Sequence, residues 1–216
     1  MVPNLWQANI AGARTAYSVQ RIAYCVFMRI IAGTKKNQKI LTPKGTITRP
    51  ALAQVREAIF SSLGNVDDLV FMDIFAGCGS LGLEALSRNA CYCYFVDNHP
   101  LALTCIINNL ERLSFQNKAH VFKRTMPFGL KNLNLEHKPH VIFCDPPYDQ
   151  NLIDKTLNAL LKYGFVGPET LVLVEHTRRE VPSAQGWHMT KQKKFGQTII
   201  SYLKLTVRSL PENLSW

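Results

Sequence analysis

From Gly64 onward, segments with the pattern of strands alternate with segments with the pattern of helices, and this alternation restricts the fold more than any other feature. Short apolar runs bounded by turn residues predict buried strands at 69–74, 91–96, 120–123, 140–144 and 170–175. Helical patterns lie between them, at 81–88, 100–113 and 151–163. Such an alternation produces βαβ units and a parallel sheet, so the predicted class is α/β.

The two ends of the chain depart from this alternation. Residues 187–194 and 198–205 are strand-like runs joined by Phe195 and Gly196, which predicts a hairpin and an antiparallel last strand. Near the other end, 29–32 and 39–41 predict two short strands around a basic loop, and Pro50 suits the first turn of a helix over 51–63. A chain of 216 residues is long enough for one α/β domain with a sizeable core.

The tetrapeptide Asp145-Pro146-Pro147-Tyr148 directly follows the buried strand predicted at 140–144. Neither proline can donate a hydrogen bond to a sheet, so the strand must stop there on a stiff turn. In open α/β sheets, ligands bind at the carboxyl ends of the strands. A carboxylate beside an aromatic ring at that edge suits a flat, amine-bearing ligand such as a nucleobase.

A glycine-rich loop follows the strand predicted at 69–74 and opens the next helix. Gly77, Gly79 and Gly82 fit the pattern G-x-G-x-x-G, which lets the backbone approach a ligand closely. Asp97 ends the next strand and can accept hydrogen bonds from ribose hydroxyls. These features fit a dinucleotide and S-adenosylmethionine equally well. Asp73, before the loop, favours S-adenosylmethionine, because a carboxylate repels a pyrophosphate and attracts an ammonium group.

Together the two motifs indicate methyl transfer to an exocyclic amine. The lone pair of such an amine is delocalised into the ring, so the enzyme must mainly position the nitrogen in line with the methyl–sulfur bond. The Asp145 carboxylate and the Pro146 carbonyl can each accept a hydrogen bond from the amine, and Tyr148 can stack on a base that is unstacked from its neighbours.

The charge distribution indicates a polyanionic partner. The chain has 25 Lys and Arg against 15 Asp and Glu, a net charge of +10. Residues 1–56 contain nine basic residues and no acidic one, which suggests a surface that contacts a phosphate backbone. Six cysteines without Cys-x-x-Cys spacing suggest no zinc site and a reducing compartment. Cys91, Cys93 and Cys144 are expected to be buried. No run of 18 apolar residues predicts a membrane span.

Several segments resemble the bacterial small-subunit ribosomal RNA (guanine-N2)-methyltransferases of the RsmD type. The resemblance runs from Met28 to about Leu205 and is found in segments 28–33, 48–50, 55–60, 73–88, 145–148 and 194–196. It implies a class I methyltransferase (Rossmann-like) fold of seven strands with S-adenosylmethionine as donor. The implied acceptor is guanine N2 of 16S ribosomal RNA, presented in an assembled small subunit. It also implies a monomer in the bacterial cytoplasm.

The resemblance assigns residues and segments as follows. Residues 1–27 would be an extension, either an organellar presequence or a start-site artefact. Residues 28–63 would form a basic RNA-contacting segment, residues 64–205 would form the methyltransferase domain, and residues 206–216 would be a tail. The catalytic residues would be Asp145, Pro146 and Tyr148. The donor-binding residues would be Asp73, Phe75, Ala76, Gly77, Gly79, Asp97 and Asn98. The RNA-binding residues would be Arg29, Lys35, Lys36, Lys39, Arg49 and Arg56.

One position departs from the family pattern, and three other functions stay open. Arg124-Thr125-Met126 stands where the family usually has an acidic residue near the adenine, so adenine recognition would rest on the backbone and on Phe122 or Met126. The nearest alternative is an adenine-N6 methyltransferase, because adenine N6 is also an exocyclic amine. A non-catalytic assembly factor and a nicotinamide oxidoreductase are the others.

Overall fold

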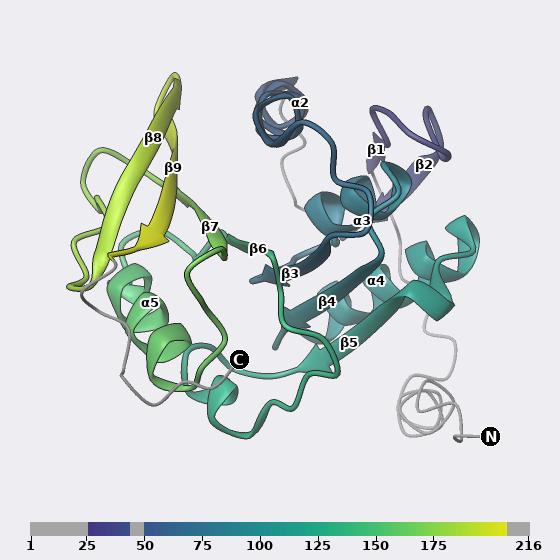
Figure 1. Cartoon of the computed structure of the whole chain (residues 1–216). Coiled ribbons are helices and arrows are strands. Elements are labelled where there is room, and N and C mark those ends of the chain that lie inside the picture. The colour runs from purple at the N-terminus through teal and green to yellow at the C-terminus, as the bar shows by residue number, and fades with distance from the viewer. Residues whose placement is uncertain (1–25, 44–49, 207–216) are drawn as a thin grey trace.

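The computed structural model describes residues 26–43 and 50–206, and its centre is one seven-stranded sheet in the order β5-β4-β3-β6-β7-β9-β8 (Figure 1). The neighbouring pairs from β5 to β7 are parallel, whereas β9 is antiparallel to both β7 and β8. The predicted α/β class, parallel sheet and antiparallel last strand are therefore confirmed. The strands of this sheet are β3 (Val70–Ile74), β4 (Tyr92–Asp97), β5 (Ala119–Lys123), β6 (Val141–Cys144), β7 (Leu171–His176), β8 (Trp187–Phe195) and β9 (Thr198–Leu205).

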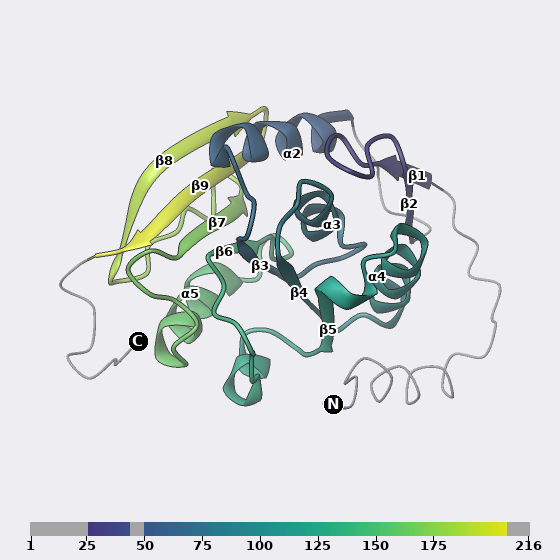
Figure 2. The same ribbon diagram turned by 45° about the vertical axis from the view of Figure 1, so that its right-hand side comes forward.

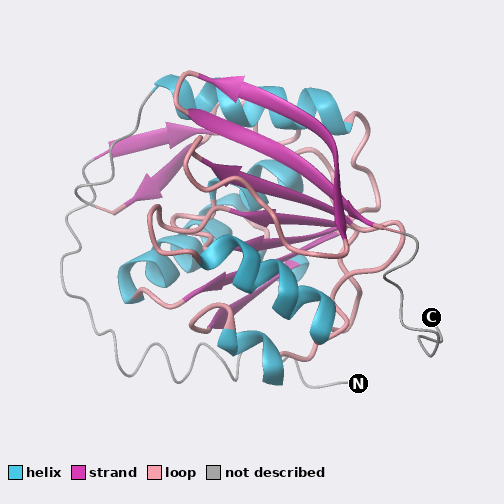
Figure 3. Cartoon of the chain, turned by 90° about the vertical axis from the view of Figure 1, so that its left-hand side faces the viewer, coloured by secondary structure: helices cyan, strands magenta, loops and turns pink. Residues whose placement is uncertain are grey.

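Helices cover both faces of the sheet because successive side chains of a buried strand point to opposite faces. In β3, Phe71 packs in the cluster on the side of the helices α2, α3 and α4, whereas Met72 packs in the cluster on the side of α5. Figure 3 shows the strands between these two layers. The helices are α2 (Pro50–Leu63), α3 (Ser80–Ser87), α4 (Pro100–Leu113) and α5 (Leu152–Lys162), with short 3-10 helices η1 (Gln116–Lys118) and η2 (Phe128–Asn132).

A second, two-stranded antiparallel sheet joins β1 (Val26–Arg29) to β2 (Lys39–Thr42) and packs beside α3 and α4. Asn109 of α4 binds this sheet through the main chain of Leu41: its Oδ1 accepts from the Leu41 N–H (2.7 Å) and its Nδ2 donates to the Leu41 carbonyl (3.0 Å). The β1–β2 turn approaches α3 so closely that a Cβ at Gly33 would lie 1.7 Å from the Ser87 carbonyl oxygen. Only glycine fits there, so this turn is fixed against the core.

Buried Glu84 of α3 is the main anchor for the first segment of the chain. Its two carboxylate oxygens accept hydrogen bonds from the main-chain N–H groups of Ile31 (2.8 Å) and Ala32 (3.0 Å). Arg88 donates to it at 2.8 Å, and the Arg56 Nε lies 3.5 Å away. Figure 2 shows the result: α2 lies across the sheet between β1–β2 and the β8–β9 hairpin.

Most predicted element boundaries agree with the structure to within one residue, but the first strand was placed wrongly. The prediction was 29–32, whereas β1 ends at Arg29, because the N–H groups of Ile31 and Ala32 bond to Glu84 rather than to a strand. The predicted burial of Cys91 is also wrong, since its side chain is exposed. Residues 1–25 and 207–216, which hold most of the predicted extension and most of the predicted tail, lie outside the described residues. Val26 and Phe27, which the prediction assigned to the extension, belong to β1. No helix in the described ranges is long and apolar enough to cross a membrane.

Candidate active site

Four carboxylates come together at the carboxyl ends of neighbouring parallel strands. Asp73 lies in β3, Asp97 ends β4, Asp145 follows β6, and Glu175 lies in β7, in the sheet order β4-β3-β6-β7. A cavity of about 180 Å³ opens at this edge, and we call it the glycine-loop cavity. It is lined by Met28, Thr42, Val55, Arg56, Ile59, Phe75, Ala76, Gly77, Cys78, Ser80, Leu81, Asp145 and Glu175.

The glycine loop between β3 and α3 has a backbone that fits a ligand. Phe75 (φ 62°), Gly77 (φ 56°) and Gly79 (φ 79°) all adopt left-handed conformations, which are costly for the non-glycine residue Phe75. A Cβ at Gly77 would meet no atom within 4 Å, whereas one at Gly79 would lie 3.1 Å from the side chains of Phe95 and Ile106. Gly79 therefore serves internal packing, while the open space above Gly77 leaves the loop backbone accessible to a ligand.

Asp73 lies beneath this loop. Its side chain is buried, its Oδ2 accepts a hydrogen bond from the Gly82 N–H at 3.0 Å, and it is not among the residues that line the cavity. Burial, offset in part by this hydrogen bond and increased by the charge of Asp97, raises the pKa of Asp73 to about 8. In this arrangement Asp73 holds the start of α3 against the sheet, and its contact with an ammonium group stays a prediction.

Asp97 connects the loop to the next strand. Its Oδ2 accepts from the Gly77 N–H and its Oδ1 from the His99 N–H, both at 2.8 Å. Each oxygen keeps a second lone pair, so the carboxylate can also accept hydrogen bonds from two hydroxyl groups. The neighbouring Asn98 is exposed and its amide lies 3.5 Å from the Thr125 hydroxyl, at the ends of β4 and β5. The ribose contact at Asp97 stays a prediction.

The Asp-Pro-Pro-Tyr turn places the Asp145 carboxylate in the glycine-loop cavity and the Tyr148 ring at the carboxyl edge of the sheet. Asp145 lines the cavity, and no hydrogen bond within the described ranges engages its carboxylate or the carbonyl oxygen of Pro146. The Tyr148 hydroxyl donates to Glu175 Oε1 at 3.2 Å, and the ring is 46% exposed. The Asp145 carboxylate and a half-exposed aromatic ring are therefore available to a ligand, whereas Pro146 is buried and is not among the residues that line this cavity.

Glu175 belongs to the site although the sequence did not single it out. It is the acidic residue that follows the apolar run 171–174 in β7, the strand beside β6, and this was the signal that could have found it. Desolvation by the surrounding protein, followed by the charges of Glu175 and Asp73, raises the pKa of the Asp145 carboxyl well above its usual range, although water reaches its side chain. Desolvation likewise raises the pKa of Glu175, and the hydrogen bond from Tyr148 opposes this rise.

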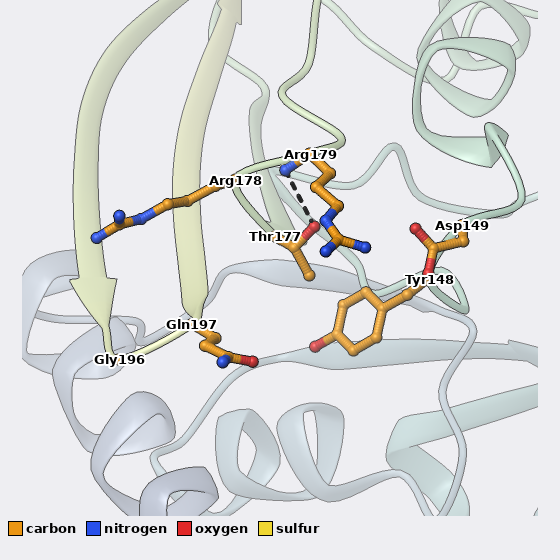
Figure 4. A pocket seen from close by; sticks show the side chains of 7 residues that line it. All are labelled: Tyr148, Asp149, Thr177, Arg178, Arg179, Gly196 and Gln197. Atoms are coloured by element: carbon orange, nitrogen blue, oxygen red, sulfur yellow. Dashed lines mark hydrogen bonds between the residues drawn. The ribbon is translucent and has the colours of Figure 1, made fainter.

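A larger second cavity, of about 550 Å³, is lined in part by Tyr148 (Figure 4). Its lining comes from three loops that the sequence separates widely, and two arginines project from one of them. We call it the arginine cavity. It is lined by Tyr148, Asp149, Thr177, Arg178, Arg179, Gly196 and Gln197.

The predicted RNA-binding residues do not form one surface. Arg56 is not an exposed contact: its side chain is 3% exposed, its Nη2 donates to the Arg29 carbonyl at 2.6 Å, and it pairs with Glu84. Arg29, Lys36 and Lys39 are exposed on the β1–β2 sheet and its turn, and Lys35 is half-buried with its Nζ 5.8 Å from the centre of the Phe115 ring. Their contact with RNA stays a prediction. Arg49 lies outside the described residues.

The residues present fit S-adenosylmethionine. The glycine-loop cavity is smaller than the roughly 300–1,000 Å³ of pockets that enclose a whole small molecule, so it does not enclose the whole donor. Asp97 and Asn98, outside this cavity, are available to the adenosine part. Phe122 is half-buried and stacks on Tyr94, and Met126 is buried, so their contact with an adenine stays a prediction. In the described ranges, no group of three His, Cys, Asp or Glu side chains could hold a metal ion.

A seven-stranded sheet with an antiparallel last strand, a glycine loop after β3 and an Asp-Pro-Pro-Tyr turn after β6 define a class I S-adenosylmethionine-dependent methyltransferase. The chain belongs to the family described as Conserved hypothetical protein 95, which matches residues 28–204. The resemblance to methyltransferases of the RsmD type is thereby confirmed.

Individual relatives match most of the chain. Ribosomal RNA small subunit methyltransferase D of Escherichia coli (strain K12) is 33% identical over 174 residues, which are 79% of this chain and 86% of that protein. YlbH of Bacillus subtilis (strain 168) is 33% identical over 181 residues, 82% of this chain and 98% of that protein. The solved structure of the Escherichia coli protein yhhF superposes with a TM-score of 0.72 at 29% identity, covering 84% of this chain and 99% of that one.

Proposed function

We propose that this protein transfers a methyl group from S-adenosylmethionine to the exocyclic N2 of a guanine in small-subunit ribosomal RNA, during or after assembly of the subunit. The single observation that supports it best is that Asp145 and the backbone of the glycine loop line the same cavity. The acceptor for the amine and the surface for the donor are thus adjacent. The RNA substrate is suggested by the relative in Escherichia coli, which is named for the small-subunit ribosomal RNA.

The chain's own groups supply positioning and charge stabilisation. The bound donor provides an activated methyl group on a sulfonium. Asp145 and the Pro146 carbonyl would accept the two hydrogen bonds of the guanine amine, which turns the nitrogen lone pair toward the methyl group and stabilises the positive charge that develops on nitrogen. The half-exposed ring of Tyr148, held by Glu175, would stack on the flipped base.

Asp145 must be ionised to accept from the amine and to stabilise positive charge. Its raised pKa means that Asp145 is protonated at a higher pH than an ordinary aspartate, so activity should be lost as the pH falls through this pKa. After methyl transfer, the methylated nitrogen loses one proton. The Asp145 carboxylate accepts this proton and releases it to water at the open edge of the cavity.

A second candidate is methylation of adenine N6 in RNA or DNA, because the same two acceptors suit that amine. The described residues add no separate module that could read a DNA sequence, since everything from β3 to β9 belongs to one sheet and its helices. For this reason we place the guanine of ribosomal RNA first.

A labelling experiment tests the proposal. The full-length protein is incubated with labelled S-adenosylmethionine and, separately, with undermethylated small subunits, naked ribosomal RNA and DNA, and the modified nucleoside is identified. We expect N2-methylguanosine from the small subunit or its RNA. Label recovered as N6-methyladenosine, or in DNA alone, would refute the guanine assignment.

The role of Asp145 can be tested separately. Asp145→Ala should lower turnover by about 10²–10³-fold, the loss seen when one stabilising hydrogen-bonding group is removed from an active site. Donor affinity, measured by calorimetry, should change little. Asp67→Ala removes an exposed carboxylate that precedes β3, at the opposite edge of the sheet, and is the matched control. Equal losses of turnover and donor affinity in Asp145→Ala would show that Asp145 is structural.

A further inference from the structure

The arginine cavity has the composition of a site for a phosphodiester. Arg178 and Arg179 follow β7 and are both exposed, and no ion pair within residues 26–43 and 50–206 involves either of them. Figure 4 shows Arg179 pointing into the space between Thr177 and Tyr148, and the Gln197 side chain directed toward the same ring. Arg178 extends away from Tyr148, over the β8–β9 hairpin. A guanidinium without a carboxylate partner is free to bind an anion.

This cavity is connected to the glycine-loop cavity through Tyr148. Tyr148 lines the arginine cavity, and its hydroxyl donates to Glu175, which lines the glycine-loop cavity. Because Asp145 and Tyr148 lie on the same turn, a base held at Asp145 would lie beside the ring of Tyr148. Its sugar and phosphates would then extend toward the arginine cavity, which Tyr148 lines.

We propose that the arginine cavity binds the RNA backbone beside the target nucleotide, with Arg179 on the phosphate next to that nucleotide and Arg178 on the backbone further along the hairpin. The proposal rests on the proposed function, since it assumes an RNA substrate whose base reaches Asp145. The volume of about 550 Å³ suits a nucleotide unit. Asp149, which lines the cavity beside Tyr148, offsets one positive charge, so the lining keeps one net positive charge.

Two lysines of the hairpin, Lys191 and Lys193, are less suited to this role because they contact α2. Lys193 Nζ donates to the Ala58 carbonyl at 3.1 Å, and Lys191 Nζ lies 3.5 Å from the Ser62 hydroxyl. The β8–β9 hairpin is therefore held against α2 on one side, and its turn at Gly196 and Gln197 forms one wall of the arginine cavity on the other. The pairing of β8 with β9 thus places this turn beside Tyr148.

The test compares Arg179→Ala, Arg178→Ala and Arg179→Lys with Arg112→Ala. Arg112 is exposed at the last turn of α4, which lies at the opposite edge of the sheet because α4 runs antiparallel to the strands. Affinity for undermethylated small subunits is measured at several salt concentrations, together with kcat/KM, donor affinity and Tm. We expect Arg179→Ala to bind about three- to tenfold more weakly, with a salt slope lower by about 1, and Arg178→Ala to show a smaller loss.

Three results separate the possibilities. Arg179→Lys should keep the salt slope of the wild type, and donor affinity and Tm should be unchanged in all variants. If Arg179→Ala and Arg178→Ala match Arg112→Ala while the wild type methylates guanine N2, the phosphate site is refuted and the proposed function stands. If the wild type methylates no small-subunit guanine, the proposed function itself fails.

Discussion

Arg56→Met tests whether Arg56 acts through the fold or through RNA. The substitution removes a guanidinium that is 3% exposed, together with its hydrogen bond to the Arg29 carbonyl (2.6 Å) and its ion pair with Glu84 (3.5 Å). Methionine has a similar length and can fill the same space. Glu84 itself stays buried, with the Ile31 and Ala32 N–H groups and Arg88 as its remaining partners.

The expected loss of stability is about 3 kcal/mol. Breaking a buried ion pair by removing one partner typically costs about 3–5 kcal/mol, because the other charge is left uncompensated. Here the cost lies at the lower end for two reasons. Glu84 keeps three hydrogen-bonding partners, and the Nη1 of Arg56, which is buried without a partner, is removed as well. The destabilisation should act on the docking of β1–β2 and α2 against α3.

Urea unfolding of the full chain measures this loss. With an m value of about 2 kcal/mol per M, the midpoint should fall by about 1.5 M with m unchanged. A double-mutant cycle with Glu84→Gln should show that the two losses are not additive, since the residues form one network. A midpoint within about 0.2 M of the wild type, combined with weaker RNA binding and a lower salt slope, would refute the reasoning and return Arg56 to an RNA contact.

Two further predictions concern the site and the packing beneath it. Removing the charge in Glu175→Gln should lower the pKa of Asp145, so the acidic limb of the pH profile of kcat/KM should move to lower pH; Glu169→Gln, at an exposed surface position, is the control, and an unmoved limb would contradict the coupling. Gly82→Ala should lower the stability by about 1–3 kcal/mol despite its better helix propensity, because the new Cβ would lie 2.3 Å from Phe95 Cε1 and 2.6 Å from Cys93 Sγ. A Tm at or above that of the wild type would show that α3 can move away from the sheet.

Local patterns predicted the elements well where one rule dominates. The helix predicted at 100–113 and the strand predicted at 198–205 agree with α4 and β9 residue for residue. A proline marks the start of the helix, and a run of mainly apolar residues marks the strand. The strand predicted at 29–32 failed because a side chain 52 residues away, that of Glu84, captures the main-chain N–H of Ala32. Such a long-range hydrogen bond leaves no trace in the local sequence.

The sequence by itself determined the parallel sheet, the glycine loop and the Asp-Pro-Pro-Tyr turn, since these depend on periodicity and on residues with restricted backbones. Tertiary structure alone decided which charges are available. Arg56 is buried against Glu84, whereas Arg178 and Arg179 are exposed beside Tyr148, although all three are arginines in the sequence. It also brought Glu175 to Asp145, because β6 and β7 are neighbours in the sheet. Burial and proximity arise from the packing of distant segments, so a residue's type does not reveal them.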